Sequence, residues 1–188
     1  MRNRSLANAT SAIYMDVLIV IDTEYLKTNY PNPSQNPNNP TGIDHISQFM
    51  ICAGTRGVIS GQGTATLSFK ANPGDYVSFY ATSIYANSND AVILNNIKQW
   101  SGENVLDTFT VNLVERTNAV RPDVNAINGF PAVTGVDSFI SLDSRVIENG
   151  TATFLVYFTI YTLADDRETQ VLCGYYCWNP TITAYRTV

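Results

Sequence analysis

The segment over residues 151–163 constrains the fold more than any other part of the sequence. Apolar side chains occupy alternate positions along it, at Ala152, Phe154, Val156, Phe158 and Ile160. The positions between them are mostly Thr and Tyr. A period of two is typical of a β-strand with one face in a protein core, because successive side chains point to opposite faces. We therefore expect a long strand here, and it needs a sheet around it.

The composition extends this expectation to the whole chain. Val, Ile and Thr together number 51, whereas Lys and Glu, the commonest surface helix formers, number 8, and this ratio favours strands. The 188 residues, 45% apolar and 14% charged, are typical of one packed domain rather than a disordered chain. We predict an all-β, single-domain antiparallel sandwich, jelly-roll-like, over residues 12–188, after a flexible N-terminal segment over residues 1–11.

The first expected strand covers residues 12–22. Its centre, Val17-Leu18-Ile19-Val20-Ile21, is apolar at consecutive positions, which is typical of a strand covered on both faces. We therefore place this strand in the middle of a sheet. One helical turn is expected over residues 23–27, with Asp22 as its N-cap and Pro31 beyond its end.

Two turn signals predict β-hairpins. Asn72-Pro73-Gly74-Asp75 fits a type II turn and would join strands over residues 64–70 and 76–84. Asn149-Gly150 would join strands over residues 138–147 and 151–163. Further short strands are expected in the following segments: residues 46–51, 56–60, 91–97, 105–114, 169–178 and 181–185.

Two long loops complete the expected fold. Residues 29–42 contain four of the eight prolines and many Asn, so this loop is stiff and can hold an ordered shape. Residues 115–137 show no sustained period and are expected to form a second long connection. Loops of this length in compact domains are usually functional or lie at interfaces.

Charge and targeting signals exclude some partners. The net charge of -5 is a poor match for nucleic acid or an anionic membrane. Residues 5–11 are small and polar where a signal peptide would be apolar, and the longest apolar run nearby has five residues. We expect a soluble cytoplasmic protein, with Cys52, Cys173 and Cys177 reduced, buried and unpaired. One histidine and no Cys-x-x-Cys motif make zinc the weaker alternative for these thiols.

Catalytic chemistry finds little support in the sequence. His45 is the only histidine, and Asp44 beside it would point the opposite way on an extended chain, so the pair is not a relay. No nucleophile elbow, phosphate-binding loop or metalloprotease motif is present. Two acidic groups, Asp22 with Glu24 and Asp165 with Asp166 and Glu168, lack calcium-loop spacing and are interpreted as caps or turns. We expect no enzyme, metal or cofactor.

The aromatic residues, which include 11 Tyr and 2 Trp, are more informative about function than the titratable residues. A buried Tyr must satisfy its hydroxyl, so some of these rings are expected at rims or interfaces beside Asn amides. Ordinary partly buried packing is the other interpretation. The candidate ligand-binding residues are Asp22, Tyr25, Tyr30, Asn32, Trp100 and Trp178.

Several segments resemble the PixA/AidA inclusion body protein family. These are residues 16–25 (DVLIVIDTEY), 29–42 (NYPNPSQNPNNPTG), 73–75 (PGD) and 174–180 (GYYCWNP). The resemblance implies a bacterial, intracellular protein with no known catalytic activity, and family members include crystalline inclusion proteins and quorum-sensing-regulated proteins. The chain is similar to the AidA-like branch, because it has only three Met where the inclusion-forming branch is methionine-rich. Asn179 replaces the Asp usual in the closing motif.

Three hypotheses follow. The first is a non-enzymatic sandwich that self-associates into a dimer or larger homo-oligomer and accumulates in the cell. The second is a module that binds a carbohydrate or another small metabolite through the Asn/Pro loop and its tyrosines. The third, a hydrolase, rests only on His45 and scattered carboxylates.

Overall fold

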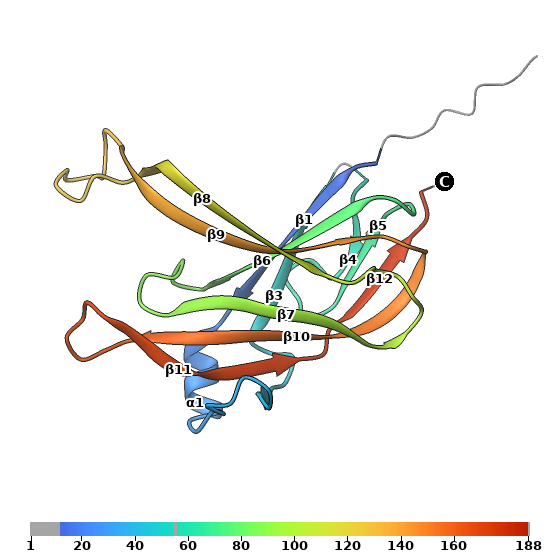
Figure 1. Cartoon of the computed structure of the whole chain (residues 1–188), viewed down its shortest axis with the longest axis horizontal. Coiled ribbons are helices and arrows are strands. Elements are labelled where there is room, and N and C mark those ends of the chain that lie inside the picture. The colour runs from blue at the N-terminus through green and yellow to red at the C-terminus, as the bar shows by residue number, and fades with distance from the viewer. Residues whose placement is uncertain (1–11, 55, 188) are drawn as a thin grey trace, which may run out of the picture.

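The computed structural model describes residues 12–54 and 56–187, so the segment over residues 1–11, expected to be flexible, lies outside the described residues. The described chain forms strands and one short helix in two packed sheets (Figure 1). In chain order these are β1 (Tyr14–Ile21), α1 (Thr23–Asn29), β2 (Thr41–Gly42), β3 (Gln48–Ala53), β4 (Val58–Ser60), β5 (Leu67–Lys70), β6 (Tyr76–Ser83), β7 (Ala91–Gly102), β8 (Thr110–Arg121), β9 (Val133–Arg145), β10 (Gly150–Leu163), β11 (Gln170–Trp178) and β12 (Thr181–Tyr185). The all-β sandwich expected from the sequence is confirmed.

The two sheets have different strand orders. Sheet A runs β3-β1-β6-β9-β8, and sheet B runs β2-β11-β10-β12-β5-β4, with β7 on the other side of β10. Most pairs are antiparallel, but β1 with β6, β11 with β2 and β12 with β5 are parallel. The sheets are therefore mixed rather than antiparallel throughout.

The alternating strand behaves as its pattern predicts. On β10 the apolar set from Ala152 to Ile160 is buried to within 1% exposure. Its outward positions carry threonines that pair across strands, with 2.9 Å between the Thr151 and Thr183 hydroxyl oxygens. One face of sheet B thus lies in the core, and the other mixes polar side chains with apolar ones such as Ile93, which pairs with Thr159 and is 42% exposed.

The first strand lies in the middle of sheet A, between β3 and β6, as predicted. Its inward residues Met15, Val17, Ile19 and Ile21 are buried. The expected cover on the second face is absent from the described chain, where the outward side chain of Leu18 is 38% exposed. Within residues 12–54 and 56–187, the prediction of a strand covered on both faces is therefore wrong.

Both predicted hairpins are wrong in their pairing. β5 and β6 lie in different sheets, and so do β9 and β10. Each turn carries the chain from one sheet to the other, and the flanking strands find other partners: β5 pairs with β12, and β6 pairs with β1. A turn motif reverses the chain direction, but in a sandwich the reversed strand can equally well face its predecessor across the core.

The prediction of a long connection over residues 115–137 is also wrong. Most of it belongs to a hairpin, because β8 pairs with β9 from Thr110 opposite Asp143 to Arg121 opposite Val133. Only four residues of β9 pair with β6. Beyond them the hairpin projects away from the body (Figure 1). We refer to residues 111–141 as the arm.

Local contacts explain where the helix begins and how the Asn/Pro loop is held. Asp22 caps α1 as predicted, and its Oδ1 accepts a hydrogen bond from the Tyr25 N–H at 3.0 Å. The loop packs against β11, where the Tyr175 N–H donates to the Ser34 carbonyl at 2.9 Å. A Cβ at Gly174 would lie 2.6 Å from Pro33, so only glycine allows this approach. Proline and glycine thus fix the loop on sheet B.

A buried ion pair ties the chain where it crosses between the sheets. Arg56 lies between β3 and β4, and its guanidinium contacts both carboxylate oxygens of Asp75 at 2.6 and 3.0 Å. The same carboxylate accepts the N–H groups of Ile13 and Asn72. Burial opposes ionisation, but these four donor contacts keep the pKa of Asp75 below its ordinary value.

Candidate functional site

Three of the six candidate ligand-binding residues lie around α1. Tyr25 donates its hydroxyl hydrogen to the Asp44 carboxylate at 2.6 Å, and the Asp44 N–H donates to the Tyr30 hydroxyl oxygen at 2.9 Å. The hydrogen bond to Asp44 raises the pKa of Tyr25 to about 12. Asp22 is occupied as the helix cap. The polar groups of this cluster therefore satisfy one another.

The other three candidates lie apart from this cluster. Asn32 is exposed in the Asn/Pro loop. Trp100, expected in a turn, lies on β7 and is 67% exposed. Trp178 belongs to the core, where it is 1% exposed and packs edge-on against Phe158 with ring centroids 5.7 Å apart. The six residues do not form one concave site.

His45 has no catalytic partner among the described residues. It is exposed, and its Nε2 lies 3.0 Å from the side-chain oxygen of Asn179. The neighbouring Asp44 carboxylate faces Tyr25 and the Ile46 N–H instead. An amide contact supplies neither a nucleophile nor an acid, so this geometry does not support the triad chemistry that the hydrolase hypothesis needs.

The acidic groups serve the local backbone. The Asp166 carboxylate accepts hydrogen bonds from the Glu168 and Thr169 N–H groups and the Thr169 hydroxyl, and these bonds lower the pKa of Asp166 to about 2. Among residues 12–54 and 56–187 no group of three or more His, Cys, Asp or Glu is placed to hold a metal ion. Asp22 caps a helix and Asp166 stabilises a turn, and these are the roles interpreted from the sequence.

The three cysteines are unpaired, as predicted. Cys52 is buried in the core, and burial raises the pKa of its thiol to about 11. Cys173 and Cys177 are half-buried on β11 rather than fully buried. The Cys173 sulfur lies 3.6 Å from the buried Tyr176 hydroxyl. A thiol kept protonated by burial is a poor nucleophile, so Cys52 is a packing residue.

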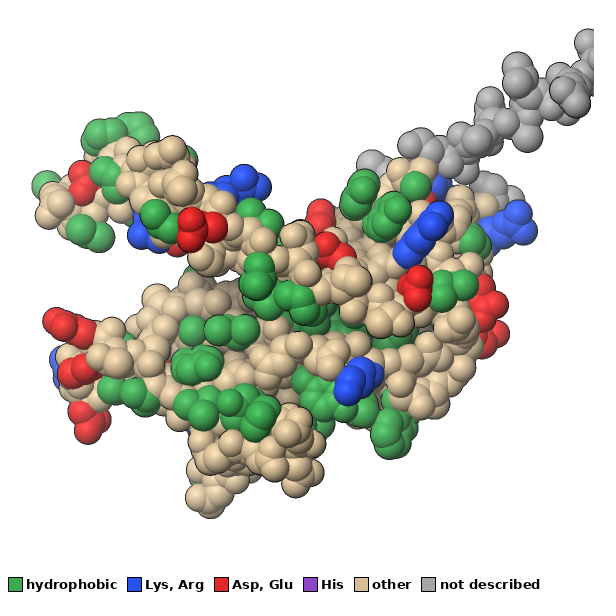
Figure 2. All heavy atoms as spheres, in the orientation of Figure 1, with side chains coloured by type: hydrophobic (Ala, Val, Ile, Leu, Met, Phe, Trp, Pro, Cys, Tyr) green, Lys and Arg blue, Asp and Glu red, His purple; other side chains and the backbone are tan. Residues whose placement is uncertain are grey.

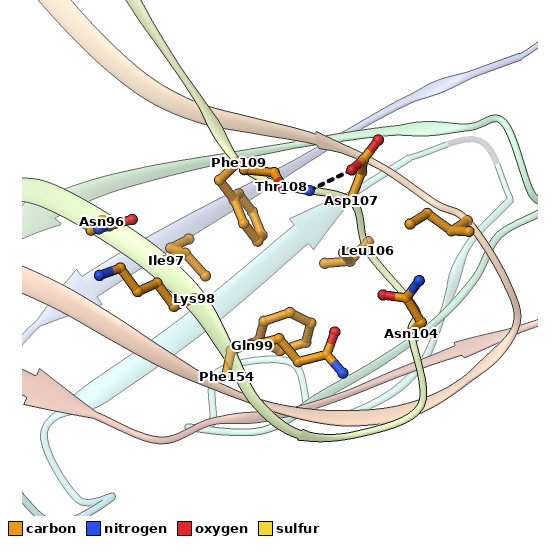
Figure 3. Close-up of a pocket in the computed structure, with 11 residues that line it drawn as sticks. Asn96, Ile97, Lys98, Gln99, Asn104, Leu106, Asp107, Thr108, Phe109 and Phe154 are labelled. Atoms are coloured by element: carbon orange, nitrogen blue, oxygen red, sulfur yellow. Dashed lines mark hydrogen bonds between the residues drawn. The ribbon is translucent and has the colours of Figure 1, made fainter.

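A concave site lies where the two sheets meet at one open edge. Its volume is about 640 Å³, and it opens between β7 and the segment that leads into β8 (Figure 3). Ile97, Leu106 and Phe154 form a buried apolar floor, and the Phe109 ring packs edge-on against Phe154 with centroids 6.1 Å apart. This site is not evident from the sequence, because its lining comes from segments far apart in the chain.

The rim of this pocket is polar and consists mainly of hydrogen-bonding side chains. It carries the following side chains: Asn96, Lys98, Gln99, Asn104, Asp107 and Thr108. The Asp107 carboxylate accepts the Thr108 N–H at 2.7 Å, and the Gln99 amide donates to the Glu103 carbonyl at 2.9 Å. The described lining contains no histidine or cysteine. Such a rim can donate and accept hydrogen bonds, but it offers no base next to a nucleophile.

The arm is the most apolar projection of the described surface. Leu113 and Val120 are each 74% exposed on its strands, and Val124, Ile127 and Phe130 are exposed at its tip. The space-filling view shows apolar side chains along the arm and an open hollow between the arm and the body (Figure 2). Exposed apolar groups gathered on one projection mark an interaction surface. The apolar positions over residues 111–139 were the signal that the sequence analysis passed over.

The fold and these surfaces define the class of protein. It is a two-sheet sandwich whose described surface carries an apolar arm and a concave site between the sheets. In the described residues, no helix has the length and hydropathy needed to cross a bilayer.

The comparisons with known proteins place the chain in a family. The model of the PixA inclusion body protein family matches residues 13–184, and the chain belongs to this family. Among solved structures, it is similar to the inclusion body protein (PixA) from Burkholderia cenocepacia J2315, with 29% sequence identity and a TM-score of 0.77 over 96% of this chain and 100% of that one. Among curated proteins, none matches the sequence significantly.

Proposed function

We propose that this protein has no catalytic role, and that it self-associates in the cytoplasm and accumulates in inclusions. The observation that carries the proposal is the arm, which presents Leu113, Val120 and Phe130 to solvent. Exposed apolar area of this kind is removed from water when two copies meet, and each Å² buried is worth about 25 cal/mol. Membership of an inclusion body protein family agrees with this role.

The charge of the arm also favours association with other copies. Its five charged residues nearly cancel, and the Arg121 guanidinium pairs internally with the Asp137 carboxylate. Electrostatic repulsion between two arms is therefore small. β8 is an edge strand of sheet A and contains no lysine, and the unpaired backbone groups of an edge strand can pair with another chain.

Shortening the arm tests the proposal. Arg121 and Val133 are paired at its end, so residues 122–132 can be replaced by Asn-Gly, a two-residue turn that closes hairpins. We expect the wild-type protein to form large particles with rising concentration, measured by light scattering, and the shortened variant to remain small and soluble. The double variant Leu113→Thr, Val120→Thr keeps the strand and should have the same effect. Particles of unchanged size in both variants would contradict the role of the arm.

A further inference from the structure

The concave site at the open edge of the sandwich has the size of a ligand pocket. Its volume is about 640 Å³, and pockets that bind small molecules ordinarily measure about 300 to 1,000 Å³. The arm, which carries the proposed self-association, contributes no residue to the described lining. The pocket therefore calls for an explanation of its own.

The interior of the pocket is apolar. Phe109, Ile97 and Leu106 point into it, with Phe154 beside them (Figure 3). Ile97, Leu106 and Phe154 are buried, whereas the Phe109 ring is only partly buried. A ligand with an apolar part would remove the remaining exposed area of this ring from water, and that burial favours binding.

The wall opposite β7 is held in place before any ligand arrives. This wall is the segment over residues 103–109, which leads into β8. The Asn104 N–H donates to the Glu148 carboxylate at 2.9 Å, and the Asp107 N–H donates to the Arg145 carbonyl at 2.9 Å. These bonds fasten the segment to the chain between β9 and β10. Since a preformed pocket loses little conformational entropy on binding, it favours affinity.

One amide on the rim offers a fixed hydrogen-bond acceptor. The Gln99 Nε2 donates to the carbonyl oxygens of Gly102 and Glu103 at 3.3 and 2.9 Å. These bonds use both hydrogens of the amide and so fix its orientation. The Gln99 Oε1 accepts no hydrogen bond from the described residues, and it lies on the side of the amide that faces Leu106 (Figure 3). A hydroxyl group of a ligand can donate to this oxygen.

The charged groups of the rim point away from the interior. The Lys98 Nζ lies over the Tyr157 ring, 5.8 Å from its centroid. The Asp107 carboxylate points away from Leu106 and Phe109 (Figure 3) and accepts the N–H of its own neighbour, Thr108, at 2.7 Å. A charged ligand would therefore lose water over an apolar floor without gaining an ion pair, which is costly.

We propose that this pocket binds an uncharged small molecule that joins an apolar ring or branched chain to a hydroxyl group. The apolar part contacts Phe109 and Phe154, and the hydroxyl donates to the Gln99 Oε1. This binding activity goes beyond the proposed self-association, and it is independent of it because the pocket and the arm share no residue.

Saturation-transfer difference NMR on the full chain tests the proposal with three probes. The probes are 2-phenylethanol, phenylacetate and 2-phenylethylamine, which share a phenyl ring and differ in charge at neutral pH. We expect 2-phenylethanol to bind with a dissociation constant on the order of 1 mM, as suits a ligand of this size. The anion and the cation should each bind at least about 10-fold more weakly, because neither finds a partner of opposite charge.

Two variants with matched controls locate the probe. Ile147→Trp, at a lining position that is 39% exposed, should weaken binding of 2-phenylethanol at least about 10-fold, because the indole occupies part of the pocket. Ile93→Trp, on the outer face of sheet B and 42% exposed, should leave binding unchanged. Gln99→Met removes the acceptor and should weaken binding about 10-fold. Gln35→Met removes an amide that also donates to two carbonyls, but far from the pocket, and should have no effect.

Circular dichroism melting of each variant checks its fold. Binding that survives both Ile147→Trp and Gln99→Met unchanged would place the probe elsewhere and overturn the proposal. Equal affinity for all three probes would contradict the uncharged interior, and no binding of 2-phenylethanol well above the expected dissociation constant would overturn the pocket altogether. None of these results alters what is expected of the arm variants, so the two proposals can fail separately.

Discussion

The outer faces of the two sheets differ in how their polar side chains are satisfied. On sheet B, Thr151 faces Thr183 and Thr153 faces Thr181, and the Asn95 amide donates to the Thr159 hydroxyl at 2.7 Å. These hydroxyls and amides satisfy one another and remain compatible with water. On sheet A, the outward positions mix Leu18 and Ile51 with Asp16, Ser78 and Asp143, and one carboxylate oxygen of Asp143 has no hydrogen-bond partner among the described residues.

Both sheets contribute an apolar inner face to the same core, with Val17 and Phe79 from sheet A and Phe154 and Phe158 from sheet B. The two sheets thus share one core and differ in their outer faces.

The largest expected effect concerns the inner faces, where the sheets should behave alike. Phe79 of sheet A and Phe154 of sheet B both pack edge-on against Phe109, with centroids 5.7 and 6.1 Å away. Phe79→Ala and Phe154→Ala should each lower the free energy of unfolding by about 3 to 5 kcal/mol, measured by urea denaturation. A much smaller loss for Phe79→Ala would mean that sheet A lacks a true core face.

A slightly smaller effect is expected at the ion pair that ties the two sheets together. Asp75→Asn leaves the half-buried guanidinium of Arg56 without its charged partner, which should lower the free energy of unfolding by about 3 kcal/mol. Because the pKa of Asp75 is lowered by folding, its stabilisation is complete above the unfolded pKa of about 3.9 and is lost as the pH falls below it. The wild-type protein should lose stability in acid more steeply than Asp75→Asn, and parallel curves would contradict this.

The smallest effect should be on the outer face of sheet B. Thr183→Ala removes one cross-strand hydroxyl contact and should lower the free energy of unfolding by about 0.2 to 1 kcal/mol. The size of the particles, measured by light scattering, should stay at its wild-type value. If Thr183→Ala reduced particle growth as much as the double variant Leu113→Thr, Val120→Thr, association would not be confined to the arm.

Parts of this molecule follow from local sequence patterns. The alternation on β10 identified which side chains enter the core, and Asp22 marked the start of α1. Both features depend on neighbours within one turn or one strand. The strand partners did not follow, because Pro73-Gly74 and Asn149-Gly150 reverse the chain without deciding whether it continues in the same sheet.

The surfaces were harder to predict for a related reason. Residues 115–118, Glu-Arg-Thr-Asn, interrupt the apolar pattern of β8, and the pairing of β8 with β9 shifts register there. The periodicity is lost at that irregularity, so the arm was interpreted as a loop. The continuously apolar β1 was interpreted as a strand covered on both faces, but in the described chain Leu18 on its outward face is 38% exposed.

Hydroxyl-radical footprinting read by mass spectrometry would test the contact between copies most directly, because it measures the solvent access of individual side chains. The protein is compared at concentrations below and above the onset of particle formation. We expect Leu113, Val120 and Phe130 of the arm to become protected as particles form, while Tyr157 and Tyr161 on the outer face of sheet B react at an unchanged rate. Equal reactivity of Leu113 and Phe130 in dilute and associated protein would contradict the account.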